Sequence, residues 1–443
     1  MKSEVQARCG MKGRLRCALA AWGKGAALLA ACILAGLLAM TAVYAIPAEA
    51  VRENVKTSVR ILEQEGVRHE AIPGYKGSRL DTFTDAIMLG NAVVMPEETA
   101  FKNALLTHRL LTSEAIDALG QYLEDESAVG TVPYSIYWHG YLTVLKPLLC
   151  VMSLGSIRFL LMAVQMLLLA AVAALMGRRG MARYVLPLAA MAVSLCPPAV
   201  MSCLTYSSVY LVGMGAAALI LLAHERLERI GYGYVFLLVG VLTSFFDFLT
   251  YPIFTLGIPL AVLALATMQT GGHVRPVRLA ALCMAWGAGY GGMWAGKWLL
   301  VSALTEVDGL GEALFEVAYR TGSSLDDVGE VSATAGLESC MELLLNPLMV
   351  MVLAACVGAC LLLLWRRGVR RGAAADALAL ALIALLPVAW LLFACNHSVS
   401  HAFFAYRSLS VLVFAALCAP LALAGNALRT RIAACQKAED GLQ

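Results

Sequence analysis

Charged residues are scarce in this chain, and so are the motifs that bind nucleotides in soluble enzymes. Only 14% of its 443 residues are charged, whereas 60% are hydrophobic and the mean hydropathy is +0.76. Soluble globular proteins carry roughly 25% charged residues, so the composition excludes that class and indicates a membrane protein. No Walker-type loop and no convincing GxGxxG segment occurs. The glycine-rich GAGYGG (287–292) lies within an apolar run and indicates close packing of helices.

Cysteine is present but forms no recognisable framework. The thirteen cysteines contain no CxxC pair, which removes the support for a zinc site or a thioredoxin-like motif. Most of them lie inside apolar runs, where a thiol behaves as a small hydrophobic group. The sequence therefore predicts no metal site built on cysteine.

Long charge-free runs dominate the rest of the chain. A helix needs about 20 apolar residues to cross the hydrocarbon core of a bilayer. Runs of that order occur at 26–46, 159–177, 184–223, 231–272, 279–303, 343–365, 377–396 and 408–428. Two runs have double length, and CPP (196–198) and DFLTYP (247–252) interrupt them. The pattern predicts an all-α polytopic membrane protein with about ten transmembrane helices.

Basic residues cluster in the segments that would all lie on one side of such a bundle. The short clusters are GRRGMAR (177–183), HERLER (224–229), HVRPVR (273–278) and WRRGVRR (365–371). Positive charge marks the cytoplasmic side, so we expect cytoplasmic termini, at 1–25 and 429–443, on a multi-pass protein of the cell membrane. The transmembrane domain then spans 26–428, with long extracytoplasmic loops at 47–156 and 304–343.

Asp81 and Asp85 lie in the first of these external loops, within SRLDTFTDAIML. Residues four apart share one face of a helix, so both carboxylates are candidates for acid–base chemistry. The alternative is an ordinary solvated helix surface. Asp247, in DFLTYP, is a third external carboxylate. It is a candidate for binding substrate hydroxyls or a divalent ion, or it caps the turn that follows.

The segment before the last apolar run carries a second group of candidates. His397 and His401 stand four residues apart, and Tyr406 and Arg407 follow them. An arginine at the outer boundary opposes the positive-inside trend, and its planar fork of donors suits a phosphate. The alternative is an arginine whose head group reaches the lipid headgroups. Two histidines alone do not complete a metal site.

YSIYWHGYLTVLKPLL (134–149) supplies the last candidates. Its tyrosines and tryptophan are suited to the membrane interface. His139 and Lys146 lie about two helical turns apart and could face a lipid headgroup. An amphipathic helix lying on the membrane explains the same pattern without chemistry.

Together these residues resemble the GT-C superfamily of membrane glycosyltransferases. The chain looks most like the polytopic members of bacterial surface-polysaccharide clusters and like serotype-conversion glucosyltransferases. The resemblance covers most of 26–428 in architecture, with a first span that leads into a long external loop. It rests on the segments LDTFTD, YWHGYLTVLKPLL, SFFDFLTYP and NHSVSHAFFAYR.

This resemblance implies a polyprenyl-phosphate sugar as donor and a glycan or lipid as acceptor, in contact with membrane lipids and without nucleic acid. It also implies a catalytic base in the first external loop, which is Asp81 or Asp85. These acids come about 35 residues after the first span, later than in many relatives. Arg407, Lys146 and the histidines would bind the lipid phosphate. The resemblance leaves open whether a divalent cation acts as a cofactor.

Other classes of protein share parts of this pattern. A transporter or flippase of lipid-linked saccharides would also need external arginine and aromatic residues, but it commonly shows internal repeats, and no convincing repeat occurs here. A polysaccharide polymerase or ligase would use the same class of substrate. A membrane scaffold that binds a partner through its external loops needs no chemistry at all.

Overall fold

The computed structural model describes residues 11–424 except 323, 326–328 and 371. The first ten residues of the predicted N-terminal segment and the predicted tail 429–443 lie outside this range. Within it the regular structure is helical apart from two short two-stranded antiparallel sheets. One pairs β1(Arg109–Leu110) with β2(Thr131–Val132), and the other pairs β3(Ser324–Leu325) with β4(Gly329–Glu330).

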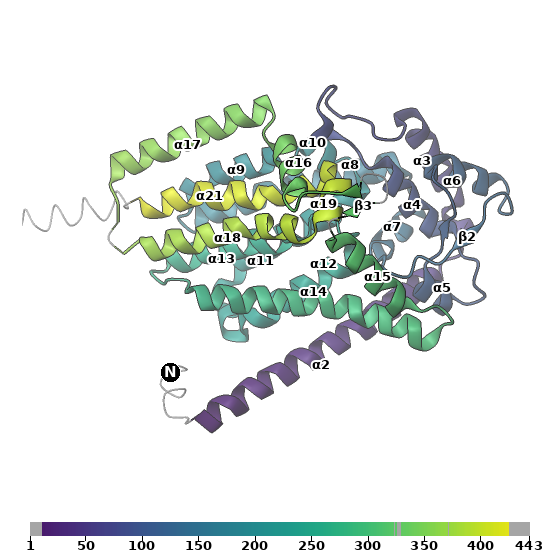
Figure 1. Cartoon of the computed structure of the whole chain (residues 1–443), viewed down its shortest axis with the longest axis horizontal. Helices are drawn as coiled ribbons and strands as arrows, with labels where there is room; N and C mark the ends of the chain where they lie inside the picture. The colour runs from purple at the N-terminus through teal and green to yellow at the C-terminus, as the bar shows by residue number, and fades with distance from the viewer. Residues whose placement is uncertain (1–10, 323, 326–328, 371, 425–443) are drawn as a thin grey trace, which may run out of the picture.

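A bundle of long helices forms one part of the molecule. In Figure 1 these helices run roughly along the long axis, with α2 crossing obliquely below the others. The bundle consists of α2(Met11–Tyr44), α8(Leu154–Arg178), α9(Val185–Ser194), α11(Leu204–Ile230), α12(Tyr232–Phe246), α13(Ile253–Gln269), α14(Pro276–Leu304), α17(Pro347–Arg367), α18(Ala374–Phe393) and α21(Ser410–Leu423).

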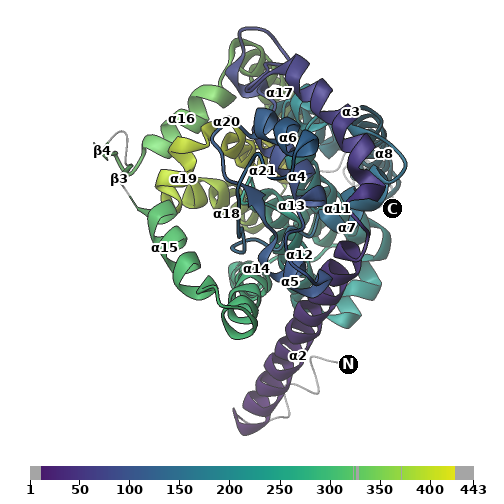
Figure 2. The same ribbon diagram turned by 90° about the vertical axis from the view of Figure 1, so that its right-hand side faces the viewer.

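Short helices from the first long loop cover one end of the bundle, and we call them the cap (Figures 1 and 2). The cap consists of α3(Glu49–Glu65), η1(Lys76–Ser78), α4(Thr82–Val93), α5(Ala100–Leu106), α6(Ala115–Glu124) and α7(Leu142–Leu149), with β1 and β2. The remaining short helices near this end are α10(Pro197–Val200), α15(Gly309–Thr321), α16(Ala335–Leu344), α19(Cys395–Ser400), α20(Ala402–Ala405) and η3(Tyr406–Leu409). The 3₁₀ helix η2(Ala182–Tyr184) precedes α9.

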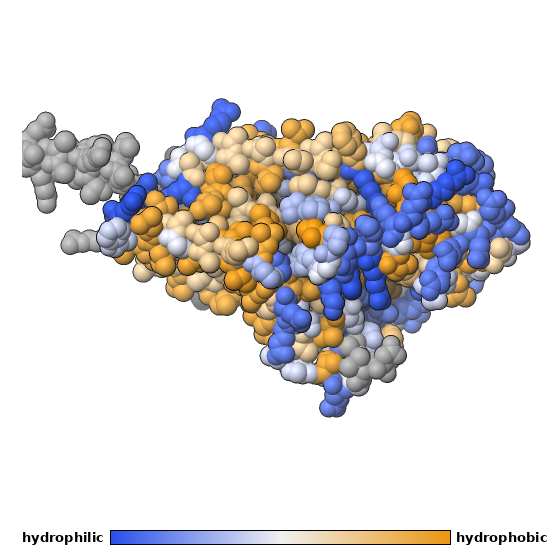
Figure 3. All heavy atoms as spheres, turned by 90° about the horizontal axis from the view of Figure 1, so that it is seen from above, coloured by the Kyte–Doolittle hydropathy of each residue, from blue (hydrophilic) through white to orange (hydrophobic). Residues whose placement is uncertain are grey.

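Several helices are suited to cross a membrane, which agrees with the prediction of an all-α, multi-pass membrane protein. Among the described residues, six helices are long and apolar enough by length and composition, and three more apolar helices are shorter. The six are Leu19–Tyr44, Leu154–Arg178, Leu204–Ile230, Pro347–Arg367, Ala374–Phe393 and Ala402–Leu423. Both double-length runs break where predicted, between α9 and α11 and between α12 and α13. Figure 3 shows apolar side chains over the bundle and hydrophilic residues gathered over the cap end.

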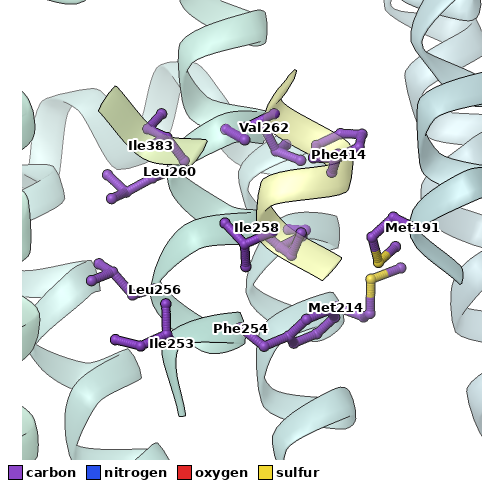
Figure 4. Packing of buried hydrophobic residues seen from close by; sticks show 14 of the residues in the cluster. Met191, Met214, Ile253, Phe254, Leu256, Ile258, Leu260, Val262, Ile383 and Phe414 are labelled. Atoms are coloured by element: carbon purple, nitrogen blue, oxygen red, sulfur yellow. The ribbon is translucent and has the colours of Figure 1, made fainter. Parts of the chain in front are cut away.

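Close packing of buried apolar residues holds the bundle together. Helix α13 is buried along nearly its whole length, and it packs against α11, α18 and α21 (Figure 4). Helices α12 and α14 approach so closely that a side chain at Gly240 or Gly289 would overlap the backbone of the other helix. Gly289 belongs to GAGYGG, so the predicted packing role of that segment is confirmed.

The basic connecting loops meet at the end of the bundle opposite the cap. Two ion pairs join them to neighbouring helices, Arg179–Glu225 at 3.2 Å and Arg278–Glu228 at 2.6 Å. A hydrogen bond of 2.7 Å between Nδ1 of His273 and Asp376 adds to them. The backbone N–H of Arg370 donates to the carbonyl oxygen of Leu423 at 2.8 Å, near the end of α21. Cap and basic loops therefore occupy opposite ends of one bundle.

Candidate functional site

A cavity of about 930 Å³ lies where the cap meets the bundle. Segments far apart in the sequence line it: the start of α4 and β1 of the cap, the start of α11, the connector between α12 and α13, α15, and α19–α20. Its charged lining residues are Arg68, Asp81, Arg109, Glu114, Glu316 and Arg320. Acids, arginines and the predicted pair His397 and His401 therefore converge on one cavity, which is open on one side.

Asp81 presents its carboxyl group to this cavity from the start of α4. The side chain caps the helix, since Oδ1 accepts a hydrogen bond from the backbone N–H of Thr84 at 3.1 Å. Asp81 is only 5% exposed, and none of the ion pairs found in the described part of the chain includes it. Burial raises the pKa of Asp81 to about 6, which suits a general base near neutral pH.

Asp85 lies one turn further along α4 but points into the protein interior. It is fully buried and does not line the cavity. Its Oδ2 pairs with Arg158 at 3.1 Å, and its Oδ1 accepts from the hydroxyl of Thr205 at 2.9 Å. The backbone N–H groups of Leu204 and Thr205, at the start of α11, also donate to it. Asp85 therefore fixes the cap to the bundle, and its position favours a structural role over the predicted catalytic one.

Arg320 enters the cavity from α15 and is held by two neighbours. Its Nε donates to Oε2 of Glu316 at 3.1 Å, one turn earlier on the same helix. Its Nη1 lies 3.1 Å from Nδ1 of His397. A guanidinium only donates hydrogen bonds, so Nδ1 of His397 is the acceptor. The side chain of Tyr137 also interacts with this guanidinium. Arg320 lines the cavity, so its charge faces any ligand that binds there.

His397 is a neutral imidazole in a defined tautomer. Its Nε2 lies 2.7 Å from the carbonyl oxygen of Leu249, which can only accept, so Nε2 carries the proton. Burial lowers the pKa of His397 well below its usual value, and the neighbouring His401 adds to the shift. The ring of His401 stacks on Phe404, and burial lowers its pKa to about 4. Both predicted histidines border the cavity as neutral groups.

Arg109 supplies a second guanidinium. It stands on β1 with its charged group 5.0 Å from the centre of the Tyr134 ring. Its Nε is buried without a hydrogen-bond partner. None of the ion pairs found among the described residues includes Arg109. Tyr134, Tyr137 and Phe248 form an aromatic wall beside it. An uncompensated guanidinium facing a cavity is suited to an anionic ligand.

Arg407 and Tyr406 lie behind the cavity wall. Arg407 is fully buried, and its guanidinium donates to three backbone carbonyls, those of Leu195, Phe403 and Gly77. The hydroxyl of Tyr406 donates to the same Gly77 carbonyl at 2.8 Å. Neither residue lines the cavity. Arg407 therefore ties α9, α20 and η1 together, and this position favours a structural role over the predicted binding of phosphate.

Three further predicted residues also lie outside the cavity lining. Both ring nitrogens of His139 are engaged, and burial lowers its pKa to about 3. Nζ of Lys146 lies 3.0 Å from the sulfur of Met95, and burial lowers its pKa to about 8. Asp247 accepts hydrogen bonds from the N–H and hydroxyl of Thr250, which is the turn-capping alternative, and burial raises its pKa to about 7.

The described residues contain no group of three or more His, Cys, Asp or Glu side chains placed to hold a metal ion. A divalent cation as cofactor therefore stays a prediction. No protein-family model, curated protein or solved structure matches this chain. The candidate site consequently rests on its own geometry.

The structure adds Arg320 and Arg109 to the residues singled out in the sequence. Arg320 left a signal, because it is the only basic residue among nine acidic ones in the loop 304–343. Arg109 left none, since it stands in a mixed polar stretch of the first loop. Only folding of the cap brings it opposite α15.

Proposed function

We propose that this protein is a GT-C-like membrane glycosyltransferase that acts at the extracytoplasmic face. In this account the ten bundle helices cross the membrane, the basic loops face the cytoplasm and the cap lies outside. The gathering of basic residues at one end and of the cap at the other supports this orientation. The cavity then lies at the outer rim of the bilayer, where a lipid-linked sugar would present its phosphate.

The observation that carries the proposal is the composition of the cavity. Asp81, a buried carboxyl group outside the ion pairs of the described residues, shares this space with three arginines, Arg68, Arg109 and Arg320, and with Glu114 and Glu316. Arg320 and Arg109 are the two guanidiniums whose surroundings suit an anionic ligand. Glycosyl transfer from a polyprenyl-phosphate sugar needs a base for the acceptor hydroxyl and cations for the departing phosphate. Both kinds of group are present, and the aromatic wall beside them is suited to a sugar ring.

The reaction follows from these positions. The acceptor hydroxyl oxygen attacks the anomeric carbon, and its proton passes to the Asp81 carboxylate. The bond between the anomeric carbon and the phosphate oxygen breaks, and its electron pair leaves with the lipid phosphate. Arg320 and Arg109 stabilise the negative charge that develops there. Asp81 replaces Asp85 as the preferred base, because the carboxylate of Asp85 is occupied by its pairing with Arg158.

An apolar groove beside the cavity supports a lipid-linked donor. A hollow of about 190 Å³ lies between α4, α7, α8, α11 and α12 and is lined almost wholly by apolar side chains. Leu204 lines this groove, and the next residue, Thr205, lines the cavity. The start of α11 thus separates an apolar space for a hydrocarbon chain from the polar space for its head group.

Turnover of a defined donor tests this function. Full-length protein in lipid nanodiscs is incubated with polyprenyl-phosphate-linked glucose and a cell-envelope glycolipid fraction, and free polyprenyl phosphate is measured. Release by the wild type and its loss in Asp81→Asn are the expected results. Movement of the donor across vesicle membranes without release would favour a flippase, and release that persists in Asp81→Asn would contradict the assigned base.

A further inference from the structure

A strained turn lies at the floor of the cavity, between α12 and α13. Leu249 has a φ of 67°, a left-handed conformation that a branched side chain rarely adopts. Such strain persists only where surrounding contacts impose it, and it is frequent at functional sites. Glycine would be the usual residue at this place in a turn. The chain therefore holds leucine here against its own backbone preference.

Asp247 supplies the first of the contacts that impose this turn. Its Oδ1 accepts from the hydroxyl of Thr250 at 2.6 Å, and its Oδ2 accepts from the backbone N–H of Thr250 at 3.0 Å. Asp247 is 4% exposed and does not line the cavity. The buried carboxylate thus closes the turn across Phe248 and Leu249 without touching the space where a ligand would bind.

The 247–250 turn also orients His397. The carbonyl oxygen of Leu249 accepts from Nε2 of His397 at 2.7 Å, which leaves Nδ1 as an acceptor. Nη1 of Arg320 donates to this Nδ1 at 3.1 Å. The N–H that Asp247 holds and the carbonyl that His397 contacts belong to the same peptide unit, between Leu249 and Thr250. The hydrogen bonds therefore connect the carboxylate of Asp247, through this peptide and the imidazole, to the guanidinium in the cavity.

We propose that Asp247 is a positioning residue, which holds the Arg320 guanidinium in the cavity by way of the 247–250 turn and His397. The strained backbone of Leu249 directs its carbonyl oxygen toward the imidazole, and the imidazole then holds the Nη1 end of the guanidinium. Glu316 fixes the other side through Nε. The link from Asp247 to Arg320 does not depend on the proposed function. Its importance for the binding of a lipid phosphate does.

Chemical modification of arginine tests the link without a substrate. Phenylglyoxal reacts with guanidinium groups, and peptide mass spectrometry of the full-length protein in nanodiscs gives separate rates for Arg320 and Arg109. Arg109 lines the same cavity, and its guanidinium lies over the ring of Tyr134, not on His397, so it serves as an internal control. In Asp247→Ala the rate at Arg320 is expected to rise about tenfold, the effect of losing one hydrogen bond to a charged group. The rate at Arg109 is expected to stay unchanged.

Conservative variants distinguish positioning from general loosening. Asp247→Asn keeps a side-chain acceptor for Thr250 and is expected to restore most of the wild-type rate at Arg320. His397→Gln retains a donor near the Nε2 position but loses the acceptor at Nδ1, so Arg320 should react as fast as in Asp247→Ala even though the turn is intact. His397→Asn, which retains an acceptor near Nδ1, should react more slowly than His397→Gln.

Two results would overturn the proposal. One is an unchanged rate at Arg320 in folded Asp247→Ala, whatever the rate in His397→Gln. The other is an equal rise at Arg320 and Arg109, which would mean that the cavity merely opens. If Asp247→Ala does not fold, His397→Gln alone decides, because it breaks the series downstream of the turn. If the wild type shows no glycosyl transfer but the variants show the expected phenylglyoxal rates, the proposed function is rejected and the positioning role of Asp247 is retained.

Discussion

Asp81 and Asp85 stand one turn apart at the start of α4, yet only Asp81 borders the cavity, while Asp85 is sealed in an ion pair with Arg158. The first residue caps the helix and keeps its carboxyl group at the cavity wall. The second accepts the backbone N–H groups that begin α11. The two acids lie one turn apart on the same helix, but one borders the cavity and the other is buried in the interior. Substitutions at the two positions should therefore have different consequences.

The rate of glycosyl transfer should depend on the ionisation of Asp81. Burial raises its pKa to about 6, and only the carboxylate can accept a proton. Activity is therefore expected to rise as the pH increases through about 6 and to level off above it. Initial rates between pH 4.5 and 8.5 measure this, with binding of the donor at each pH as the control. A rate that falls as the pH rises through this range would contradict the role of Asp81 as base.

Asp81→Asn should stabilise the fold at neutral and higher pH. The native state keeps the Asp81 proton more tightly than the unfolded chain, because burial raises the pKa from 3.8 to about 6. The contribution of this proton to the free energy of unfolding is fully present below the unfolded pKa of 3.8 and is lost as the pH rises through the native pKa of about 6. The difference between the two limits is ~3 kcal/mol. Asparagine also caps helices. The thermal midpoint of the variant should exceed that of the wild type at pH 8, and the gain should vanish toward pH 4.

Asp85→Asn should instead destabilise the protein. Removing one partner of a buried ion pair costs about 3–5 kcal/mol, and here it leaves the guanidinium of Arg158 without its deepest partner. A lower thermal midpoint in nanodiscs is the expected result, with Asp81→Asn as the matched control on the same helix. Equal midpoints for Asp85→Asn and the wild type would show that the ion pair does not hold the cap.

The two arginines that face different surroundings offer a second matched pair. Arg320→Lys keeps a charge in the cavity but loses the fork held by Glu316 and His397. Its affinity for polyprenyl phosphate should fall about tenfold, with little change in thermal midpoint. Arg407→Lys cannot serve three carbonyls in one plane, so its thermal midpoint should fall. Native mass spectrometry measures the affinity, and a loss of phosphate binding only in folded Arg407→Lys would reverse the assignment.

Much of the architecture was predictable from the sequence, because each step depends on local composition. The breaks at CPP and DFLTYP lie where helices end, and the apolar runs contain the long helices. The division of roles within the site was not predictable in the same way. Arg407 appeared as a cation at an outer boundary, and only the positions of Leu195, Phe403 and Gly77 reveal that backbone carbonyls surround it.

The same limit applies to the acids. Spacing along a helix predicts which side chains share a face, but Asp81 caps the helix and Asp85 lies inside it, so their environments differ despite the regular interval. The cavity is lined by segments hundreds of residues apart, such as those that carry Asp81 and His397. Periodicity and charge patterning carry no information on such contacts.

The most direct test of the account is the release of free polyprenyl phosphate by wild-type protein and by Asp81→Asn, compared at pH 8 and at equal occupancy with polyprenyl-phosphate-linked glucose. A role of Asp81 as the base predicts turnover by the wild type and a loss of about 10²–10⁴-fold in the variant, with donor binding retained. Equal turnover by the two proteins would contradict it.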